Sequence, residues 1–239
     1  LIAGTRDTLT RENRYIRKDG SPVWVAVTAS KTDQSGSQEP YLIVVIEDIT
    51  VRKDTELALA ARAEQQAAIM DIGQRALSEH DLNALLSDAA NVIAQIMSVD
   101  FCLISQRDRS SSEFSIVGTN DAGKKYVGWP VQPRIRHLKT IFEAPALEPG
   151  VFHRGDQDSP DITSPIMEDI GTISAASVVI AGDDNTPRGI LIIHNQTHRE
   201  FTNDEVTFLQ TMANILSAAM SRDHIASDLA EREEMLDTV

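Results

Sequence analysis

The chain has 239 residues, of which 41% are hydrophobic and 24% charged, a composition typical of soluble globular proteins with one large domain or two small ones. With 22 lysines and arginines against 36 aspartates and glutamates, its formal net charge is −14, which argues against nucleic acid or an anionic membrane as a partner. Cys102 is the single cysteine, which excludes a disulfide framework and a thiolate metal site and fits a reducing cytoplasm.

The sequence shows no sign of membrane insertion. No apolar run approaches the roughly 18 residues that span a bilayer. The first residues, LIAGTRDT, lack an initiator methionine and the basic and apolar segments of a signal peptide. We therefore expect a cytoplasmic segment of a longer chain, whose output domain can lie outside this sequence.

Three strand-like runs are predicted within residues 11–50. The first ends at KDGS, residues 18–21, in which Asp-Gly is a strong signal for a tight turn. The second alternates valine with other residues over positions 23–27, and the third, residues 41–46, follows a polar loop. Three antiparallel strands without a helix bury too little surface for a full core. This region is therefore either an added sheet or the second half of a domain whose first half is missing.

Two helices are predicted next. Residues 51–79 are rich in Ala, Glu, Gln and Arg, which favours a long helix with only a weak apolar stripe. Asp81 stands at an N-cap position before an amphipathic helix that ends near residues 97–100. A strand over residues 101–105 and its hairpin partner over residues 114–118 follow.

The middle of the chain, residues 120–172, is the least regular part. Short helices are predicted there at residues 135–142 and 166–170. Beyond it, residues 174–181 and 189–194 read as two strands joined by the turn GDDNTPR, which is a clear hairpin pattern.

A long final helix begins after Thr202 and Glu205, which match a capping box. Its apolar positions repeat at seven, with one polar interruption at Arg222. The repeating residues are Met212, Ala219 and Ala226, together with Ile215, Leu229 and Leu236. Packing of a single amphipathic helix on its own domain explains residues 206–219, whereas the extension beyond Arg222 favours a parallel coiled coil and a homodimer through helical linkers.

Two motifs near the start carry a first resemblance: YIRKDGSPVWV at residues 15–25 and EDITVRK at residues 47–53. At this spacing the pair resembles the C-terminal half of a PAS domain, often called the PAC motif. The half of a PAS domain that normally holds the ligand is absent from this sequence.

Four segments carry a second resemblance, in an order typical of one family. They are the opening segment at 69–104, VGTNDAG at 117–123, the hairpin at 174–193 and the closing segment at 188–220. Together they resemble a GAF domain, and FTNDE before the last helix is the best single marker. The resemblance implies a small sensory domain with a central antiparallel sheet flanked by helices.

The predicted fold class is therefore α+β, with four parts. These are a partial PAS antiparallel sheet (residues 1–50), a long connecting helix (51–79), a GAF domain (80–221) and an outgoing C-terminal coiled-coil helix (222–239).

Three chemistries known for GAF domains fit the motifs poorly. Cyclic-nucleotide sites carry an Asn-Lys pair and then Phe, three residues and Asp-Glu, whereas here Gln196 follows Asn195 and two residues separate Phe201 from Asp204. Covalent bilin attachment uses a cysteine in the irregular middle segment, which has none. Reduction of free methionine sulfoxide needs several cysteines, and Cys102 lies in an apolar strand where a buried structural thiol is expected. The ligand or cofactor stays unidentified.

Three histidines are candidates for the pocket, which in GAF domains lies between the sheet and the irregular middle segment: His137, His153 and His194. His194 ends a strand in phase with Ile190 and Ile192, which favours an inward side chain. Each is also explained as a structural or surface histidine. No metal-ligand spacing, Walker A loop, nucleophile elbow or kinase signature occurs, so we expect no metal site, no catalytic residue and no enzyme activity in this segment.

The junction at Asp48, Ile49 and Thr50 is the candidate signal relay, because the matching residues of PAS domains join the core to the outgoing helix. Asp48 or Thr50 can cap the free N–H groups of the helix while Ile49 anchors it to the sheet. An ordinary capped strand-to-helix turn needs the same residues.

The sequence thus predicts a sensory input module for signal transduction. A small ligand would bias helix packing, and the helices would relay that bias to a histidine kinase of a two-component system or to a cyclic-di-GMP enzyme. The alternatives are a ligand-independent dimerisation scaffold and a GAF-type enzyme that uses Cys102.

Overall fold

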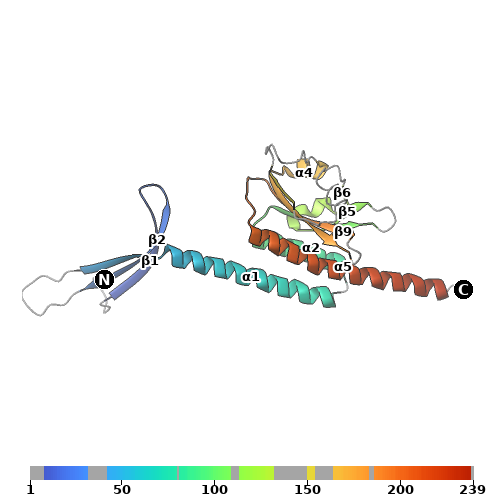
Figure 1. The fold of residues 1–239 in the computed structure, drawn as a ribbon, viewed down its shortest axis with the longest axis horizontal. Coiled ribbons are helices and arrows are strands. Elements are labelled where there is room, and N and C mark those ends of the chain that lie inside the picture. Colours follow the sequence, from blue (N-terminus) through green and yellow to red (C-terminus); the bar gives the residue numbers. More distant parts are fainter. Residues whose placement is uncertain are drawn as a thin grey trace, which may run out of the picture. The chain divides into compact units, whose positions relative to one another are not determined.

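The computed structural model describes residues 8–31, 42–79, 81–108, 113–131, 150–153, 164–182 and 186–237. The chain forms two compact units, Leu1–Ala63 and Glu64–Val239, which are described one at a time (Figure 1). The short helix predicted at residues 135–142, and His137 within it, lie outside the described residues.

The first unit is a three-stranded antiparallel sheet in the order β1-β2-β3, formed by β1 (Thr8–Ile16), β2 (Pro22–Lys31) and β3 (Leu42–Asp48). The turn between β1 and β2 is the predicted one: Gly20 has φ +85°, and the Asp19 carboxylate accepts hydrogen bonds from the backbone N–H and the hydroxyl of Ser21. Five consecutive apolar side chains of β3, at 42–46, are 47–66% exposed. The sheet alone therefore leaves apolar surface uncovered.

Helix α1 (Thr50–Ser78) follows β3 after one intervening residue, as the alanine-rich composition predicts. Its only buried side chains among those described are Ile72 and Ala76, close to its C-terminal end, and both pack in the core of the second unit.

The second unit is built on a six-stranded antiparallel sheet in the order β6-β5-β4-β9-β8-β7. Its strands are β4 (Phe101–Arg107), β5 (Phe114–Thr119), β6 (Pro130–Val131), β7 (Gly150–His153), β8 (Ser174–Ala181) and β9 (Pro187–Asn195). Helices α2 (Leu82–Met97) and α5 (Asn203–Asp237) lie on one side of this sheet, and α4 (Pro165–Ile170) lies on the other (Figure 1).

The alternation of side chains along the strands divides the interior into two layers. On β4, Cys102 and Ile104 pack with α2 and α5 in the main core, whereas Leu103 points to the opposite layer with Tyr126 of the 3-10 helix η1 (Asp121–Tyr126). Gly118 on β5 permits the close approach of α2, because a Cβ there would lie 2.7 Å from the Cβ of Leu86.

The sequence-based prediction of an α+β fold with antiparallel sheets is confirmed. The predicted N-cap of α2 is present, with Asp81 accepting the backbone N–H of Ala84 at 3.0 Å. The capping box of α5 is also formed, since the Thr202 hydroxyl accepts the Glu205 N–H and the Glu205 carboxylate accepts the Thr202 N–H. The sequence analysis missed η1, β6 and β7.

The heptad seam predicted along the last helix needs one correction. Met212 and Ala219 are fully buried in the core of their own unit, so they do not face a second chain. Of the predicted seam, Leu229 beyond Arg222 is exposed, as is the neighbouring Ile225. The side chain of Leu236 lies outside the described residues.

Candidate functional site

The junction of β3 and α1 is tied to β2 by short hydrogen bonds. The Asp48 carboxylate accepts the backbone N–H of Thr50 at 3.0 Å and its hydroxyl at 2.6 Å, and the Thr50 hydroxyl in turn accepts the backbone N–H of Trp24 at 3.1 Å. Ile49 is 4% exposed, and its backbone N–H donates to the Trp24 carbonyl at 2.9 Å. Asp48 therefore caps the first helical N–H, whereas Thr50 bonds to the neighbouring strand.

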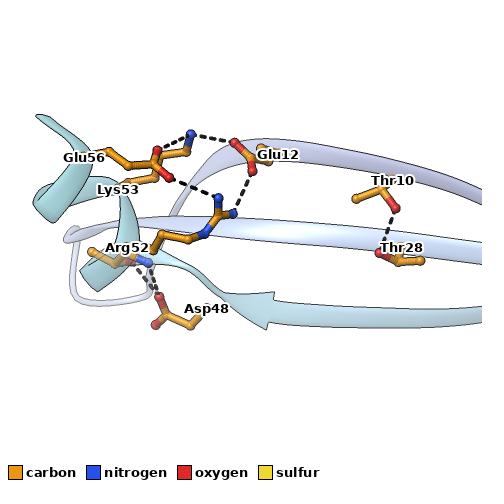
Figure 2. Close-up of polar contacts among 8 residues, drawn as sticks. Thr10, Glu12, Thr28, Asp48, Arg52, Lys53 and Glu56 are labelled. Atoms are coloured by element: carbon orange, nitrogen blue, oxygen red, sulfur yellow. Dashed lines mark hydrogen bonds and ion pairs between the residues drawn. The ribbon is translucent and has the colours of Figure 1, made fainter. Parts of the chain in front are cut away.

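A charged cluster surrounds the first turn of α1 (Figure 2). Glu12 of β1 bridges Arg52 and Lys53 at 2.7 Å each, and Glu56 contacts the same two cations at 3.2 and 3.1 Å. Hydrogen bonds from Lys53 and Arg52 lower the pKa of Glu12, and the bond to Glu12 raises the pKa of Lys53. Arg52, Glu12 and Glu56 are well exposed and Lys53 partly so, and the cluster therefore orients the helix start more than it stabilises the fold.

A cavity of about 40 Å³ lies in the second unit between the sheet and α4. Strands β4, β5, β6 and β9 and the N-terminal half of α4 contribute the lining: Leu103, Ser105, Ile116, Pro130, Val131, Ser164, Pro165, Ile166, Met167, Ile190, Ile192 and His194. Nine of these twelve are apolar, and the cavity has room for a few water molecules.

His194 is the polar group of this cavity that lacks a partner. Its side chain is 1% exposed, its Nδ1 lies 3.2 Å from the Thr172 hydroxyl, and its Nε2 has no hydrogen-bond partner among the described residues. Burial lowers the pKa of His194 to about 3, so the imidazole is neutral. If the buried Thr172 hydroxyl donates to Nδ1, the proton of the neutral ring sits on Nε2, which is then a free donor.

Helix α4 is capped at both ends and is bonded to η1. The Ser164 hydroxyl accepts the Met167 N–H at its start, and Gly171 ends it in the left-handed conformation with φ +73°. Asp169 receives hydrogen bonds from Lys125 at 2.6 Å and from the Tyr126 hydroxyl at 2.7 Å, which lower the pKa of the carboxyl group. These contacts connect α4 to η1.

Residues 81–220 match the family described as the GAF domain, which is more than half of the chain. The chain belongs to the GAF domain family. GAF domains are regulatory and sensory domains that often bind small ligands in signalling proteins. No curated protein sequence matches the chain.

Solved GAF domains share this fold at low sequence identity. The domain of a phosphoenolpyruvate-protein phosphotransferase from Coxiella burnetii has a TM-score of 0.59 at 17% identity, over 70% of this chain and 98% of that one. A domain assigned to a sensor histidine kinase of Pseudomonas syringae pv. tomato has a TM-score of 0.53 at 13% identity, over 74% and 99% of the two chains. The phycoerythrobilin-bound domain of a cyanobacterial phytochrome has a TM-score of 0.56 at 10% identity, over 68% and 97%. At these identities the likeness concerns the fold.

Among the three predicted histidines, the structure places His194 in the GAF cavity together with Ile190 and Ile192. His153 does not line this cavity: its Nδ1 lies 3.2 Å from the Ser174 hydroxyl, and its ring stacks on His198 at a centroid distance of 5.0 Å. The sequence analysis missed Thr172, which lies between α4 and β8, because the tertiary partner of a hydroxyl leaves no pattern along the chain.

Cys102 lies in the helix-facing core of the GAF domain and is fully buried. Burial in apolar surroundings raises the pKa of its thiol, which suppresses the reactive thiolate. This removes the hypothesis of an enzyme that uses Cys102.

Metal-binding clusters and membrane-spanning helices are both absent from the described ranges. These ranges contain no group of three or more His, Cys, Asp or Glu residues placed to hold a metal ion. No helix within them is both long and apolar enough to cross a membrane.

Proposed function

We propose that the chain is a sensory input module of a signalling protein. In this proposal the GAF domain, residues 80–221, binds a small ligand in the cavity beneath α4. The helical segments at 51–79 and 222–239 relay the resulting change to an output domain, either a histidine kinase or a cyclic-di-GMP enzyme.

The observation that carries the ligand proposal is the buried Nε2 of His194, which has no hydrogen-bond partner within the part of the chain that the structure describes. A buried polar atom without a hydrogen bond costs about 1–3 kcal/mol relative to a paired one. A ligand that accepts a hydrogen bond from Nε2–H removes this cost, because the bound state then contains the hydrogen bond that the empty state lacks. The atom thus marks the point at which the cavity would select its ligand.

The surroundings of His194 indicate the chemical class of that ligand. The part of the lining that the structure describes is mostly apolar and holds no charged side chain, so an ion buried against it would lack compensation from these residues. We therefore infer an uncharged or locally uncharged ligand with an apolar body and one hydrogen-bond acceptor. Covalent bilin attachment is not proposed, since residues 120–172 contain no cysteine.

The first unit fits the C-terminal part of a PAS domain, which we propose for residues 1–50. Arg17, from the motif at 15–25, bonds to Asp48 of the motif at 47–53 at 2.7 Å, so the two stretches that carry the resemblance meet in space. The exposed apolar side chains of β3 fit a sheet that belongs to a larger domain.

A thermal-shift screen of the whole chain tests the ligand proposal, with nucleotides, haem, flavins, bilins and small metabolites as probes. A probe at one hundred times its Kd stabilises the folded state by about 2.7 kcal/mol, a rise of several degrees in Tm. His194→Asn keeps a polar group near Nδ1 and removes the one at Nε2, so the shift should disappear in this variant. His194→Gln, which keeps a polar group near Nε2, is the matched control and should retain part of it.

Two results would count against this proposal: no probe stabilises the GAF domain, or a probe stabilises His194→Asn as strongly as the unaltered chain. The first of these would favour the alternative, a ligand-independent dimerisation scaffold. That alternative draws its support from the exposed Ile225 and Leu229 on α5.

A further inference from the structure

Helix α5 leaves the core of the GAF domain at one position. Its side chains are buried at intervals from Phe208 to Ser221, and among those described beyond Ser221 none is fully buried. Arg222 is the first residue after this boundary, and it turns toward the end of α1.

The guanidinium of Arg222 caps the C-terminal end of α1. Nη1 donates to the carbonyl of Ala76, in the last turn, and Nη2 donates to the carbonyl of Glu79, one residue past the helix, at 2.5 Å. The last carbonyls of a helix have no partner within it and form the negative end of its dipole, so a cation placed there is favourable. The guanidinium of arginine holds two donors in a fixed planar geometry that matches two carbonyls, whereas the donors of a lysine ammonium rotate about a single nitrogen.

The basic residue within the last turn of α1 itself is engaged elsewhere. Arg75 forms an ion pair with Asp88 of α2 at 2.5 Å. The cap of α1 therefore comes from a side chain that is 143 residues away from Glu79 in the sequence.

The same end of α1 contributes to the core that α5 also enters. Ile72 and Ala76 belong to the buried cluster that contains Leu216 and Ala219 of α5. Arg222 thus contacts α1 directly beside the residues by which α1 joins this core.

We propose that Arg222 couples the incoming helix α1 to the outgoing helix α5, so that a displacement of the last turn of α1 reaches α5 without passing through the ligand cavity. Two carbonyls that move together carry the guanidinium with them, and the guanidinium is attached to α5 at the point where its apolar packing ends. The inference rests on the proposed relay role of the two helices, but it does not need a ligand beneath α4.

Amide hydrogen exchange of the whole chain, followed by mass spectrometry, tests the link. Loss of a hydrogen bond to a charged group should speed exchange by about tenfold or more. Arg222→Ala should therefore accelerate exchange both at residues 74–79 and at residues 223–230. Arg75→Ala is a second perturbation of the same end: it removes the ion pair of α1 with Asp88 while Arg222 is kept, so it too should accelerate exchange at residues 223–230.

The decisive measurement perturbs one helix and observes the other. Ile72→Ala loosens the end of α1 and should accelerate exchange at residues 223–230 when Arg222 is present, but not in the Arg222→Ala background. Because Ile72 is buried in the main core, its loss also accelerates global opening, which amides of β8 report; the acceleration at residues 223–230 is therefore compared with that at β8. Arg222→Lys provides a second background, which keeps the positive charge but loses the planar pair of hydrogen bonds to the two carbonyls. The acceleration at residues 223–230 should be smaller there too.

Equal acceleration of residues 223–230 with and without Arg222 would overturn the inference, because the perturbation would then travel through the apolar core. No acceleration in either background would also overturn it. Both outcomes are independent of the thermal-shift screen, so failure of the link and failure of the ligand proposal are told apart.

Discussion

His194 combines complete burial with a titratable ring. Its pKa in the folded protein is lowered from 6.5 to about 3 by desolvation. In the unfolded chain His194 therefore binds a proton below pH 6.5, whereas in the folded chain it binds one only below about pH 3. Stability is fully present above the unfolded pKa and falls as the pH drops through this window.

This predicts an acid-sensitive GAF domain. Between pH 7.5 and pH 5, His194 should reduce the free energy of unfolding by about 2 kcal/mol. Urea unfolding at both pH values measures the loss, with His194→Gln as the control that has no proton to bind. The prediction is wrong if the variant loses as much stability as the unaltered chain.

At the scale of elements, the start of α1 depends on Thr50 more than its place at a helix end suggests. Its hydroxyl is the acceptor for the Trp24 N–H of β2 and a donor to Asp48, so one side chain joins two strands and a helix. Valine has the same shape without either hydrogen bond.

Thr50→Val should therefore leave the part-buried Trp24 N–H unpaired, at a cost of about 1–3 kcal/mol. We expect faster amide exchange at Trp24 and over residues 51–54. Thr50→Ser keeps the hydroxyl and should exchange nearly as slowly as the unaltered chain. Equal protection in the valine and serine variants would show that the hydroxyl does not hold the junction.

The elements also show how far the sequence could predict the structure. Helix α2 was predictable because its side-chain periodicity indicates which face is buried, and strand β8 because its run of small and β-branched residues ends at a clear turn before β9. Strands β6 and β7 have two and four residues, and they exist because a neighbouring strand pairs with them. Strands this short show no detectable alternation of apolar and polar side chains in the sequence.

The candidate site was also predictable only in part. The inward direction of His194 follows from its phase with Ile190 and Ile192, but its unpaired Nε2 depends on what α4 places opposite, which is tertiary information. Arg222 reads as a polar break in a heptad repeat. Its partners are backbone carbonyls far away in the chain, and a carbonyl acceptor has no sequence signature.

At the scale of the whole molecule, the two units differ greatly in the core that each contains. The sheet of the first unit buries little besides Val25 and Ile49 among the described residues, whereas the second has continuous apolar layers on both faces of its sheet. Each unit also holds one of the two tryptophans of the chain, Trp24 and Trp129.

Unfolding in urea should therefore occur in two steps, the first unit before the second. In the Trp129→Phe variant, fluorescence of Trp24 should change at the lower urea concentration. In Trp24→Phe, Trp129, which packs edge-on against Tyr126 at 5.4 Å, should respond at the higher one. Coincident transitions would instead show that the chain unfolds as a single cooperative unit.

The buried position of Cys102 has a practical consequence for such experiments. Since the chain has no other thiol and this one is sealed in the GAF core, a maleimide or nitroxide reagent should leave the native protein unmodified. A cysteine introduced on the surface of each unit would then be the sole point of attachment there. A pair of spin labels placed in this way turns the distance between the two units, and any change in it on ligand addition, into a directly measurable quantity.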